Sequence, residues 1–412
     1  MPALNARDSD PVTLAWMVGA PPPPEKLIRF ADGSWFRFPQ KRWSFSHIRE
    51  LMPTSAVRRA DGPPSSTPRA ERDDIDAVVF SPIGQTGSMT WAQSLDANYT
   101  DGIVILHRGR IVYERYFGAL SAARPHIAFS VTKSFVATLA VTLMVEGRLD
   151  EAQTVASYLP ELQRSALGSA TLRQLLDMTT GLDYTEDYTD PNSAVWVMSR
   201  AGGFLHRPPG YAGPESFLDF LATIQQMYPH GGKFAYKTAN TDALGAVLRR
   251  VTGRSLSDLL HERIFAPLGV EFDGYFTVDS TGAEWAGAGL NLTLRDLARF
   301  GEMMRLDGRY NGRQIVPKAV VDDIRRGADR EMFAGAGYTT LPGWSYRSMW
   351  WVSHNDHGAF TARGIHGQAI YIDPTAEMVI ARFASHPLAA NVNLDPTSLP
   401  AYHAVALHLM KT

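Results

Sequence analysis

A serine and a lysine lie three residues apart in the run Ser130-Val131-Thr132-Lys133, where an apolar stretch with helical spacing begins. Residues at positions i and i+3 share one face of a helix. A serine hydroxyl is a weak nucleophile on its own, and a lysine in apolar surroundings can lose its proton and act as the neighbouring base. Ser130 would also stand at the helix N-terminus, where backbone N–H groups favour an oxyanion. The pattern indicates a nucleophilic serine.

The alternative is a chance pairing, because a Ser-x-x-Lys pair is expected about once in a chain of this length. Ser130 and Lys133 nevertheless form the only such pair in a chain with seven lysines, and an unpaired lysine in a buried helix is costly. Tyr236 is a second candidate, because a phenol beside a cation can carry a proton to a leaving group. A packed core tyrosine is the alternative there.

The composition excludes several classes of function. With 412 residues and 45% hydrophobic residues, the chain suits a globular protein with a large core, and its net charge of -2 gives no reason to expect nucleic acid or an anionic membrane as a partner. The absence of cysteine excludes disulfides and thiolate metal sites, and no apolar run approaches the length of a membrane span. Because the N-terminus also lacks a signal-peptide pattern, we expect a cytoplasmic protein.

We also expect neither a metal nor a cofactor. The twelve histidines show no metal-ligand spacing. The runs Gly287-Ala288-Gly289 and Gly335-Ala336-Gly337 lack the third glycine and the preceding strand of a dinucleotide site, and they are predicted to be loops.

The predicted elements alternate between strands at the two ends of the chain and helices in its middle. β-branched and aromatic residues on both sides of an Arg-Gly turn predict a hairpin over 101–118, and 43–48 resembles a helix start. Helical spacing covers 130–146, 172–178, 214–227, 241–252, 255–264, 294–306 and 400–410, and strand patterns cover 350–352, 368–373 and 377–383. These patterns predict an α/β fold.

The order of these elements predicts three segments. Residues 1–125 form the N-terminal part of an α/β lobe with a wrapping segment, 126–289 form an inserted helical lobe, and 290–412 complete the α/β lobe. Residues 181–213, called the lid segment below, form a long aromatic-rich connection between helices. Connections of this length are usually functional lids or disordered.

Four motifs in sequence order resemble the serine β-lactamase and penicillin-binding protein superfamily over about residues 100–385. They are Ser130-Val131-Thr132-Lys133, Tyr236, the run at 264–269 and the run at 292–300. The resemblance implies an antiparallel sheet flanked by terminal helices, with an inserted all-helical lobe. It also implies that Ser130 is acylated, that Lys133 accepts its proton and that Tyr236 relays a proton to the leaving amine or alcohol.

Five further segments resemble the nylon-oligomer branch of this superfamily, which hydrolyses linear amides of 6-aminohexanoate. They lie at 43–47, 176–178, 182–188, 236–242 and 364–368. This resemblance implies that Tyr188 closes over the substrate and hydrogen-bonds the amide nitrogen. It implies that Ile365 supplies the second oxyanion N–H beside that of Ser130, and that the protein is a homodimer. His366 follows Ile365 and is either a wall residue or a direct participant.

Several positions depart from the superfamily pattern. Ala362 replaces the cation that β-lactamases and peptidases use for a substrate carboxylate, and Thr238 replaces the Asn of a Tyr-x-Asn motif. Both departures disfavour a β-lactamase or peptidase. Ser199 and Gly287 fall near positions where the nylon-oligomer enzymes hold the substrate's amine end with acidic or polar groups.

The sequence therefore predicts a serine hydrolase for linear amides and short-chain esters. A carboxylesterase without useful amidase activity and a non-catalytic, penicillin-binding-like sensor stay open as alternatives.

Overall fold

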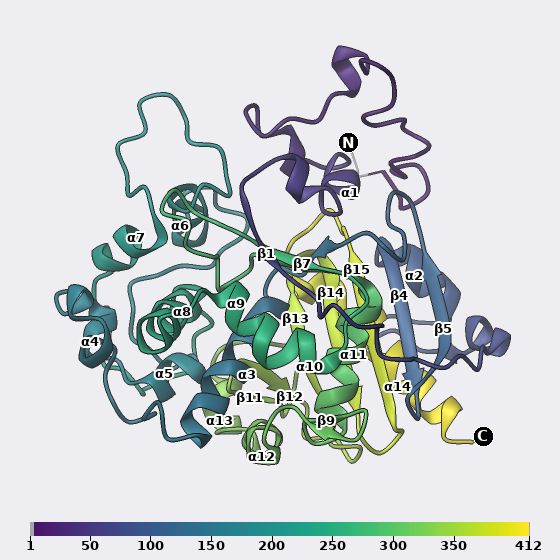
Figure 1. Ribbon diagram of the computed structural model, residues 1–412. Helices are drawn as coiled ribbons and strands as arrows, with labels where there is room; N and C mark the ends of the chain where they lie inside the picture. The colour runs from purple at the N-terminus through teal and green to yellow at the C-terminus, as the bar shows by residue number, and fades with distance from the viewer. Residues whose placement is uncertain (1–3, 412) are drawn as a thin grey trace.

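A seven-stranded antiparallel sheet forms the centre of the structure, a computed structural model that describes residues 4–411 (Figure 1). Its strand order is β11-β12-β13-β14-β15-β4-β5. The strands are β4 (Thr100–His107), β5 (Arg110–Tyr116), β11 (Ser345–Arg347), β12 (Trp350–Val352), β13 (Phe360–Gly364), β14 (Gln368–Asp373) and β15 (Met378–Ala384). The predicted hairpin is β4 and β5, and β4 pairs with β15 from the far end of the chain. The predicted α/β fold with an antiparallel sheet is confirmed.

Alternation along the strands explains why both faces of the sheet are covered. In β4, Ile103 and Ile105 belong to the core beneath α2 (Trp91–Ala97) and α14 (Asp395–Leu409), whereas Val104 and Leu106 belong to the core beneath α11 (Leu294–Arg305). Successive side chains of a strand point to opposite faces, so a strand that is apolar throughout must be covered on both sides.

The helical lobe lies beside this sheet, on the left of Figure 1. Its helices are α3 (Val131–Val145), α4 (Val155–Tyr158), α5 (Leu172–Leu176), α6 (Ala194–Ala201), α7 (Phe217–Thr223), α8 (Ala239–Thr252), α9 (Leu256–Leu260) and α10 (Ala266–Leu268). A smaller four-stranded sheet adjoins it, in the order β1 (Thr54–Val57), β7 (Gly274–Thr277), β8 (Leu290–Leu292) and β6 (His126–Ile127). The inserted helical lobe was expected, but the helix α6 within the lid segment was not.

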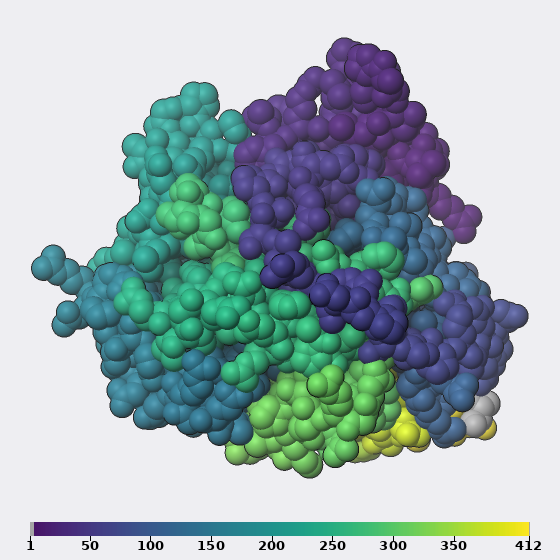
Figure 2. Space-filling view, viewed as in Figure 1, coloured from purple at the N-terminus to yellow at the C-terminus, as the bar shows by residue number. Residues whose placement is uncertain are grey.

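The remaining elements are short or lie at the edges. They are α1 (Lys41–Ser44), β2 (Val79–Phe80), β3 (Met89–Thr90), β9 (Arg309–Tyr310), β10 (Arg313–Gln314), α12 (Lys318–Arg326) and α13 (Arg330–Ala334). The N-terminal segment before β1 and the loop after α6 form two projections in the space-filling view, separated by a notch (Figure 2). Within residues 4–411, no helix is both long and apolar enough to cross a membrane.

Two predicted helix boundaries were wrong. The run at 43–48 contains the end of α1 rather than a helix start. After the helix ends, His47 folds back on Trp43, with ring centroids 3.8 Å apart and its Nδ1 2.7 Å from the Trp43 carbonyl oxygen. The last helix begins at Asp395 rather than at Pro400. Pro400 has no N–H for the carbonyl of Pro396, and that carbonyl instead accepts from the Ile83 N–H at 3.0 Å.

The motif at 292–300 has a structural role that the fold makes clear. The buried Asp296 carboxylate accepts from the Thr293 hydroxyl at 2.6 Å and from the backbone N–H groups of Glu271 and Phe272 at 2.8 and 3.2 Å. It also pairs with the buried Arg299 guanidinium at 2.8 Å. Asp296 thus ties the start of α11 to the segment that leads into β7.

Asp296→Ala is expected to lower the free energy of unfolding by about 3 kcal/mol, because it leaves the Arg299 guanidinium and three other donors without this acceptor. Urea unfolding measures the loss. The control is Asp322→Ala on α12, whose carboxylate is 52% exposed and whose replacement should change stability by about 0.5 kcal/mol or less. Equal effects of the two changes would contradict this role for Asp296.

Candidate active site

Ser130 occupies the N-cap position of α3, and its side chain makes no capping hydrogen bond. The chain reaches it from β6, which pairs with β8, and the Ala128 N–H donates to the Leu290 carbonyl at 2.8 Å. Phe129 then adopts a left-handed conformation with φ of 44°, which is uncommon for a bulky residue and often marks a functional turn. This turn, held by the buried Phe129 ring, sets the position of the Ser130 side chain.

Lys133 lies one turn into α3, fully buried, with its Nζ 2.9 Å from Ser130 Oγ. The Nζ also donates to the Gly287 carbonyl at 2.8 Å. Burial lowers the pKa of the Lys133 ammonium, although the nearby carboxylates of Glu186 and Asp242 oppose this shift. The lysine is therefore shifted toward the neutral amine, the form that can accept a proton.

Gly287 is one of two neighbours of the lysine whose roles the sequence did not reveal. A Cβ atom at Gly287 would lie 2.4 Å from Thr238 Cγ2 and 2.7 Å from Asp242 Oδ2, so only glycine allows this close approach. The Gly287 N–H donates to Asp242 Oδ1 at 3.2 Å, and burial raises the pKa of the Asp242 carboxyl. The glycine run predicted to be a loop thus carries the acceptor that holds the lysine.

Tyr236 lies on the other side of the lysine, and Lys133 Nζ is 5.1 Å from the centroid of its ring. The ring stacks on Trp351 at 5.6 Å and meets Tyr346 edge-on at 5.9 Å. Burial raises the pKa of the Tyr236 phenol well above its ordinary value, while a hydrogen bond with Ser130 opposes the shift. Tyr236 therefore stays protonated in a position next to both Ser130 and Lys133.

The end of β13 lies directly against the turn that carries Ser130. A Cβ atom at Gly364 would lie 2.7 Å from the Ala128 carbonyl oxygen and 3.1 Å from the Ser130 backbone nitrogen. Ile365 follows immediately and lines both cavities that reach Ser130. Ala362, two residues earlier, is fully buried.

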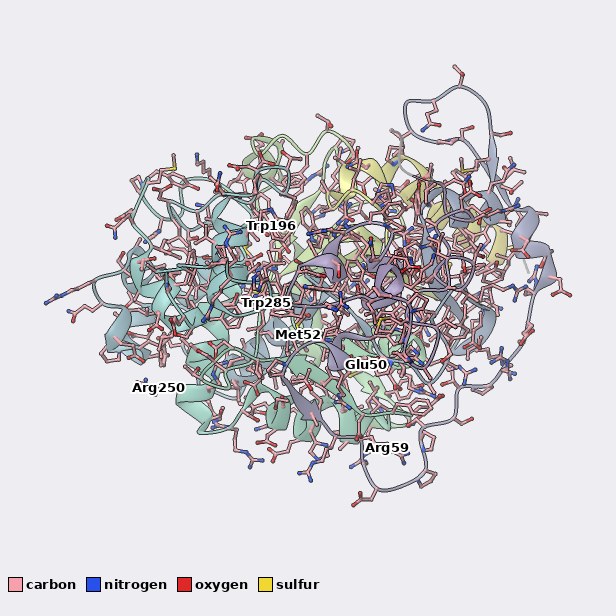
Figure 3. The ribbon with its side chains drawn as sticks, turned by 90° about the horizontal axis from the view of Figure 1, so that it is seen from above. Glu50, Met52, Arg59, Trp196, Arg250 and Trp285 are labelled. Carbon is pink, nitrogen blue, oxygen red and sulfur yellow. The ribbon has the colours of Figure 1, made fainter. Side chains whose placement is uncertain are left out.

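Two cavities meet at Ser130. The larger, of about 300 Å³, is lined by the residues Tyr188, Tyr236, Tyr338, Trp351, Arg363 and Asn391 among others. The smaller, of about 20 Å³, lies under the lid segment and is lined by Glu186, Trp196, Ser199, Phe204 and Trp285 among others. Trp196 and Trp285, which both line this smaller cavity, are labelled in Figure 3. The larger cavity has room for part of a substrate, whereas the smaller one has room for about one water molecule.

Tyr188 reaches the site from the lid segment and lines both cavities. Its hydroxyl donates to Glu186 Oε1 at 2.7 Å, and its ring packs edge-on against Trp196 at 5.9 Å. Glu186 in turn accepts from the Thr238 N–H at 2.8 Å and from the Thr238 hydroxyl at 2.6 Å. Glu186 was not singled out from the sequence, although it lies two residues before Tyr188 in a segment that was.

His366 and Ser199 lie close to the site, and each has a polar atom bonded to a backbone carbonyl. The buried His366 ring packs 5.7 Å from Phe129, its Nδ1 contacts the His386 carbonyl at 2.7 Å, and its Nε2 has no hydrogen-bond partner among the described residues. His366 lines neither cavity, and its role as a wall residue or a direct participant stays a prediction. The Ser199 hydroxyl donates to the Val195 carbonyl of its own helix at 2.7 Å.

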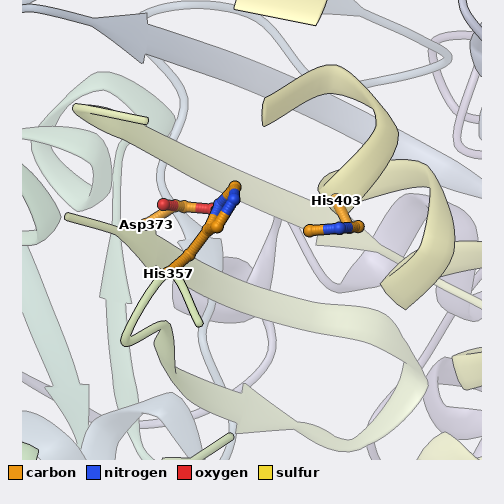
Figure 4. Close-up of side chains that lie close together, drawn as sticks. All are labelled: His357, Asp373 and His403. Carbon is orange, nitrogen blue, oxygen red and sulfur yellow. The ribbon is translucent and has the colours of Figure 1, made fainter. Parts of the chain in front are cut away.

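A group of side chains with metal-ligand chemistry lies away from both cavities. His357 Nδ1 contacts Asp373 Oδ2 at 2.7 Å, and the His403 ring lies 5.0 Å from the His357 ring (Figure 4). None of the three lines the cavities at Ser130. The absence of a catalytic metal stays a prediction.

The structure thus brings together the predicted residues Ser130, Lys133, Tyr236, Tyr188 and Ile365 around one point.

Comparisons with known proteins agree with the family that the sequence motifs resemble. A family model described as Beta-lactamase matches residues 93–397. The chain is 35% identical over 355 residues to the 6-aminohexanoate-dimer hydrolase of Paenarthrobacter ureafaciens. The aligned region covers 86% of this chain and 88% of the relative.

Other relatives extend this result. A solved structure named as a candidate 6-aminohexanoate-dimer hydrolase from Bacillus anthracis is 33% identical, with a TM-score of 0.85 over 93% of this chain and 97% of that one. Esterase EstB of Burkholderia gladioli is 29% identical over 43% of this chain and 47% of the esterase. On this evidence the chain belongs to the β-lactamase family of serine hydrolases, among relatives that include a 6-aminohexanoate-dimer hydrolase and an esterase.

Proposed function

We propose that this protein hydrolyses linear amides, of the 6-aminohexanoate-oligomer type, and short-chain carboxylic esters through an acyl-enzyme on Ser130. The observation that carries the proposal is the fully buried Lys133 amine 2.9 Å from the Ser130 hydroxyl. A nucleophile within hydrogen-bonding distance of a base, with that base fixed by a third group, is the arrangement that activates serine. Here the third group is the Gly287 carbonyl.

In the proposed reaction, Ser130 Oγ bonds to the substrate carbonyl carbon while Lys133 Nζ takes the hydroxyl proton. The N–H groups of Ser130 and Ile365 hold the resulting oxyanion, and such a donor typically contributes about 10²–10³-fold in rate. A proton passes through Tyr236 to the leaving nitrogen or oxygen as its bond to carbon breaks. Water then attacks the acyl-enzyme, releases the carboxylic acid and restores Ser130.

Amide cleavage is supported by the way Tyr188 is oriented. Because its hydroxyl hydrogen is directed to Glu186 Oε1, the oxygen of Tyr188 presents its lone pairs as an acceptor. An amide substrate has an N–H to donate to that oxygen, whereas an ester has none. The named substrate class of the 35% identical relative points the same way.

The alternatives are tested by the same experiments. A carboxylesterase without useful amidase activity would share the whole catalytic arrangement, and the esterase among the relatives keeps it open. A sensor would become acylated without releasing product. The family resemblance also leads us to propose a homodimer, which sedimentation would test.

The decisive experiment compares wild type with Ser130→Ala on the linear 6-aminohexanoate dimer, measured by amine release, and on p-nitrophenyl acetate. Wild type should release product from both, and the variant from neither, because the nucleophile is missing. More than a trace of turnover by the variant would contradict the mechanism. Ester turnover alone by wild type would establish the carboxylesterase instead, and labelling by a serine-directed probe without product would indicate a sensor.

The dependence of rate on pH should follow the protonation of Lys133. Only the neutral amine accepts the Ser130 proton, so kcat/KM should rise with pH, with its inflection below the ordinary lysine pKa of about 10.4. Asp242→Asn removes a carboxylate that stabilises the ammonium, so the pKa of Lys133 and the inflection should move to lower pH. Asp322→Asn is the control, because this carboxylate on α12 is 52% exposed and lines neither cavity at Ser130. An upward shift in Asp242→Asn would contradict Lys133 as the base.

Tyr188→Phe separates amide from ester cleavage. Loss of the hydroxyl removes the acceptor for the amide N–H and should lower kcat/KM for the 6-aminohexanoate dimer by about tenfold, equivalent to one hydrogen bond. The rate with p-nitrophenyl acetate should fall less. Parallel losses on the two substrates would argue that Tyr188 does not bind the amide nitrogen.

A further inference from the structure

Arg363 is a charged residue on the wall of the larger cavity that the catalytic arrangement does not use. It lies on β13, and its guanidinium is stacked 5.2 Å from the ring centroid of Trp351. One nitrogen, Nη2, donates to Asp395 at the start of α14. Its other nitrogens have no hydrogen-bond partner among residues 4–411 and are not sealed from the cavity. The guanidinium therefore has donors left for a ligand.

The charges around Arg363 do not balance. Arg382, on β15, is also buried and lies near enough to Asp395 and Arg363 for electrostatic interaction. Its own hydrogen bonds go to neutral groups, the Gly367 carbonyl at 2.9 Å and the Ser398 hydroxyl at 2.7 Å. Two buried guanidinium groups thus share one carboxylate, and an excess positive charge lies behind this wall of the cavity.

The direction of the larger cavity follows from Tyr236. Tyr236 lines the larger cavity and does not line the smaller one. If Tyr236 passes the proton to the leaving group, as the proposed function requires, the leaving group occupies the larger cavity. Arg363 is then on the wall of the cavity that holds the leaving group.

We propose that Arg363 and the charge excess around it bind a carboxylate on the leaving group of the substrate. The preferred substrates are amides or esters whose released amine or alcohol carries an anionic carboxylate. A carboxylate accepts two N–H groups from a guanidinium in a bidentate pair, which adds both strength and orientation. This inference rests on the proposed function.

The test uses two chromogenic esters with the same acyl group, p-nitrophenyl acetate and 3-carboxy-4-nitrophenyl acetate. The measured quantity is the ratio of kcat/KM for the anionic ester to that for the neutral one, because the intrinsic difference between the leaving groups cancels when variants are compared. Arg363→Met keeps the bulk of the side chain and removes the charge, and the ratio should fall about tenfold, the worth of one charge-assisted hydrogen bond.

A second variant is expected to change the ratio in the opposite direction, which a misfolded protein would not do. Asp395→Asn removes the carboxylate that competes for the guanidinium, so the ratio should rise. Arg108→Met, on the exposed turn between β4 and β5 with a side chain 55% exposed, is the matched control and should keep the wild-type ratio. Competitive inhibition by hexanoate, compared with hexanamide, gives a readout independent of turnover and should weaken in Arg363→Met.

The outcomes separate the two proposals. If wild type hydrolyses neither ester, the proposed serine hydrolase is contradicted and the carboxylate site with it. If wild type hydrolyses the neutral ester but the ratio stays within about twofold of wild type in both Arg363→Met and Asp395→Asn, the carboxylate site is overturned and the hydrolase stands. Opposite shifts of the ratio in the two variants support the site.

Discussion

The contact between the buried Lys133 amine and the Ser130 hydroxyl is the constraint on which the rest of this structure depends. An ammonium group is expensive to bury, and Lys133 is fully buried, so the fold must favour the neutral amine or supply partners for the charged one. It does both to a limited extent. The apolar length of α3 excludes water, while the Gly287 carbonyl and the Asp242 carboxylate lie near the amine. The lysine is left within reach of both protonation states, which a proton carrier needs.

The same burial has opposite effects on the two proton-carrying groups. Removing water penalises whichever form is charged, so it shifts Lys133 toward the neutral amine and Tyr236 toward the neutral phenol. A neutral amine accepts a proton and a neutral phenol donates one, which is the pairing that the proposed mechanism requires. Reversing the roles would require a phenolate in a site that strongly disfavours one.

Much of the fold and part of the site could be predicted from local patterns. The i, i+3 spacing of Ser130 and Lys133, and the hairpin of β4 and β5, depend on residues close in sequence, and the structure shows both. The acceptor for the lysine could not be predicted, because it is a backbone carbonyl from a residue 154 positions away. Backbone atoms carry no residue-type signal, so the sequence predicted a loop at 287–289 and a place for Gly287 near the substrate, but no contact between Gly287 and the lysine.

Hydrogen bonds between side chains that are far apart in the sequence could not be predicted for a related reason. The Arg363–Asp395 pair spans 32 positions and the contact of Glu186 with Thr238 spans 52, and neither residue of either pair forms a recurring spacing. Thr238 appeared from the sequence only as a departure from an Asn-containing motif. In the structure, the N–H and the hydroxyl of Thr238 both donate to the Glu186 carboxylate, which in turn accepts from the Tyr188 hydroxyl.

These paired charges make the site polar at two places. Glu186 is fixed by the first residues of the α8 region and Arg363 by the first residue of α14, so each charge is anchored to a helix rather than to a mobile loop. Ser130 lies between the two cavities that these residues line. Fixed charges of opposite sign on the two sides of a nucleophile favour one orientation of an extended substrate over its reverse, because reversal would place each end of a charged chain beside a like charge.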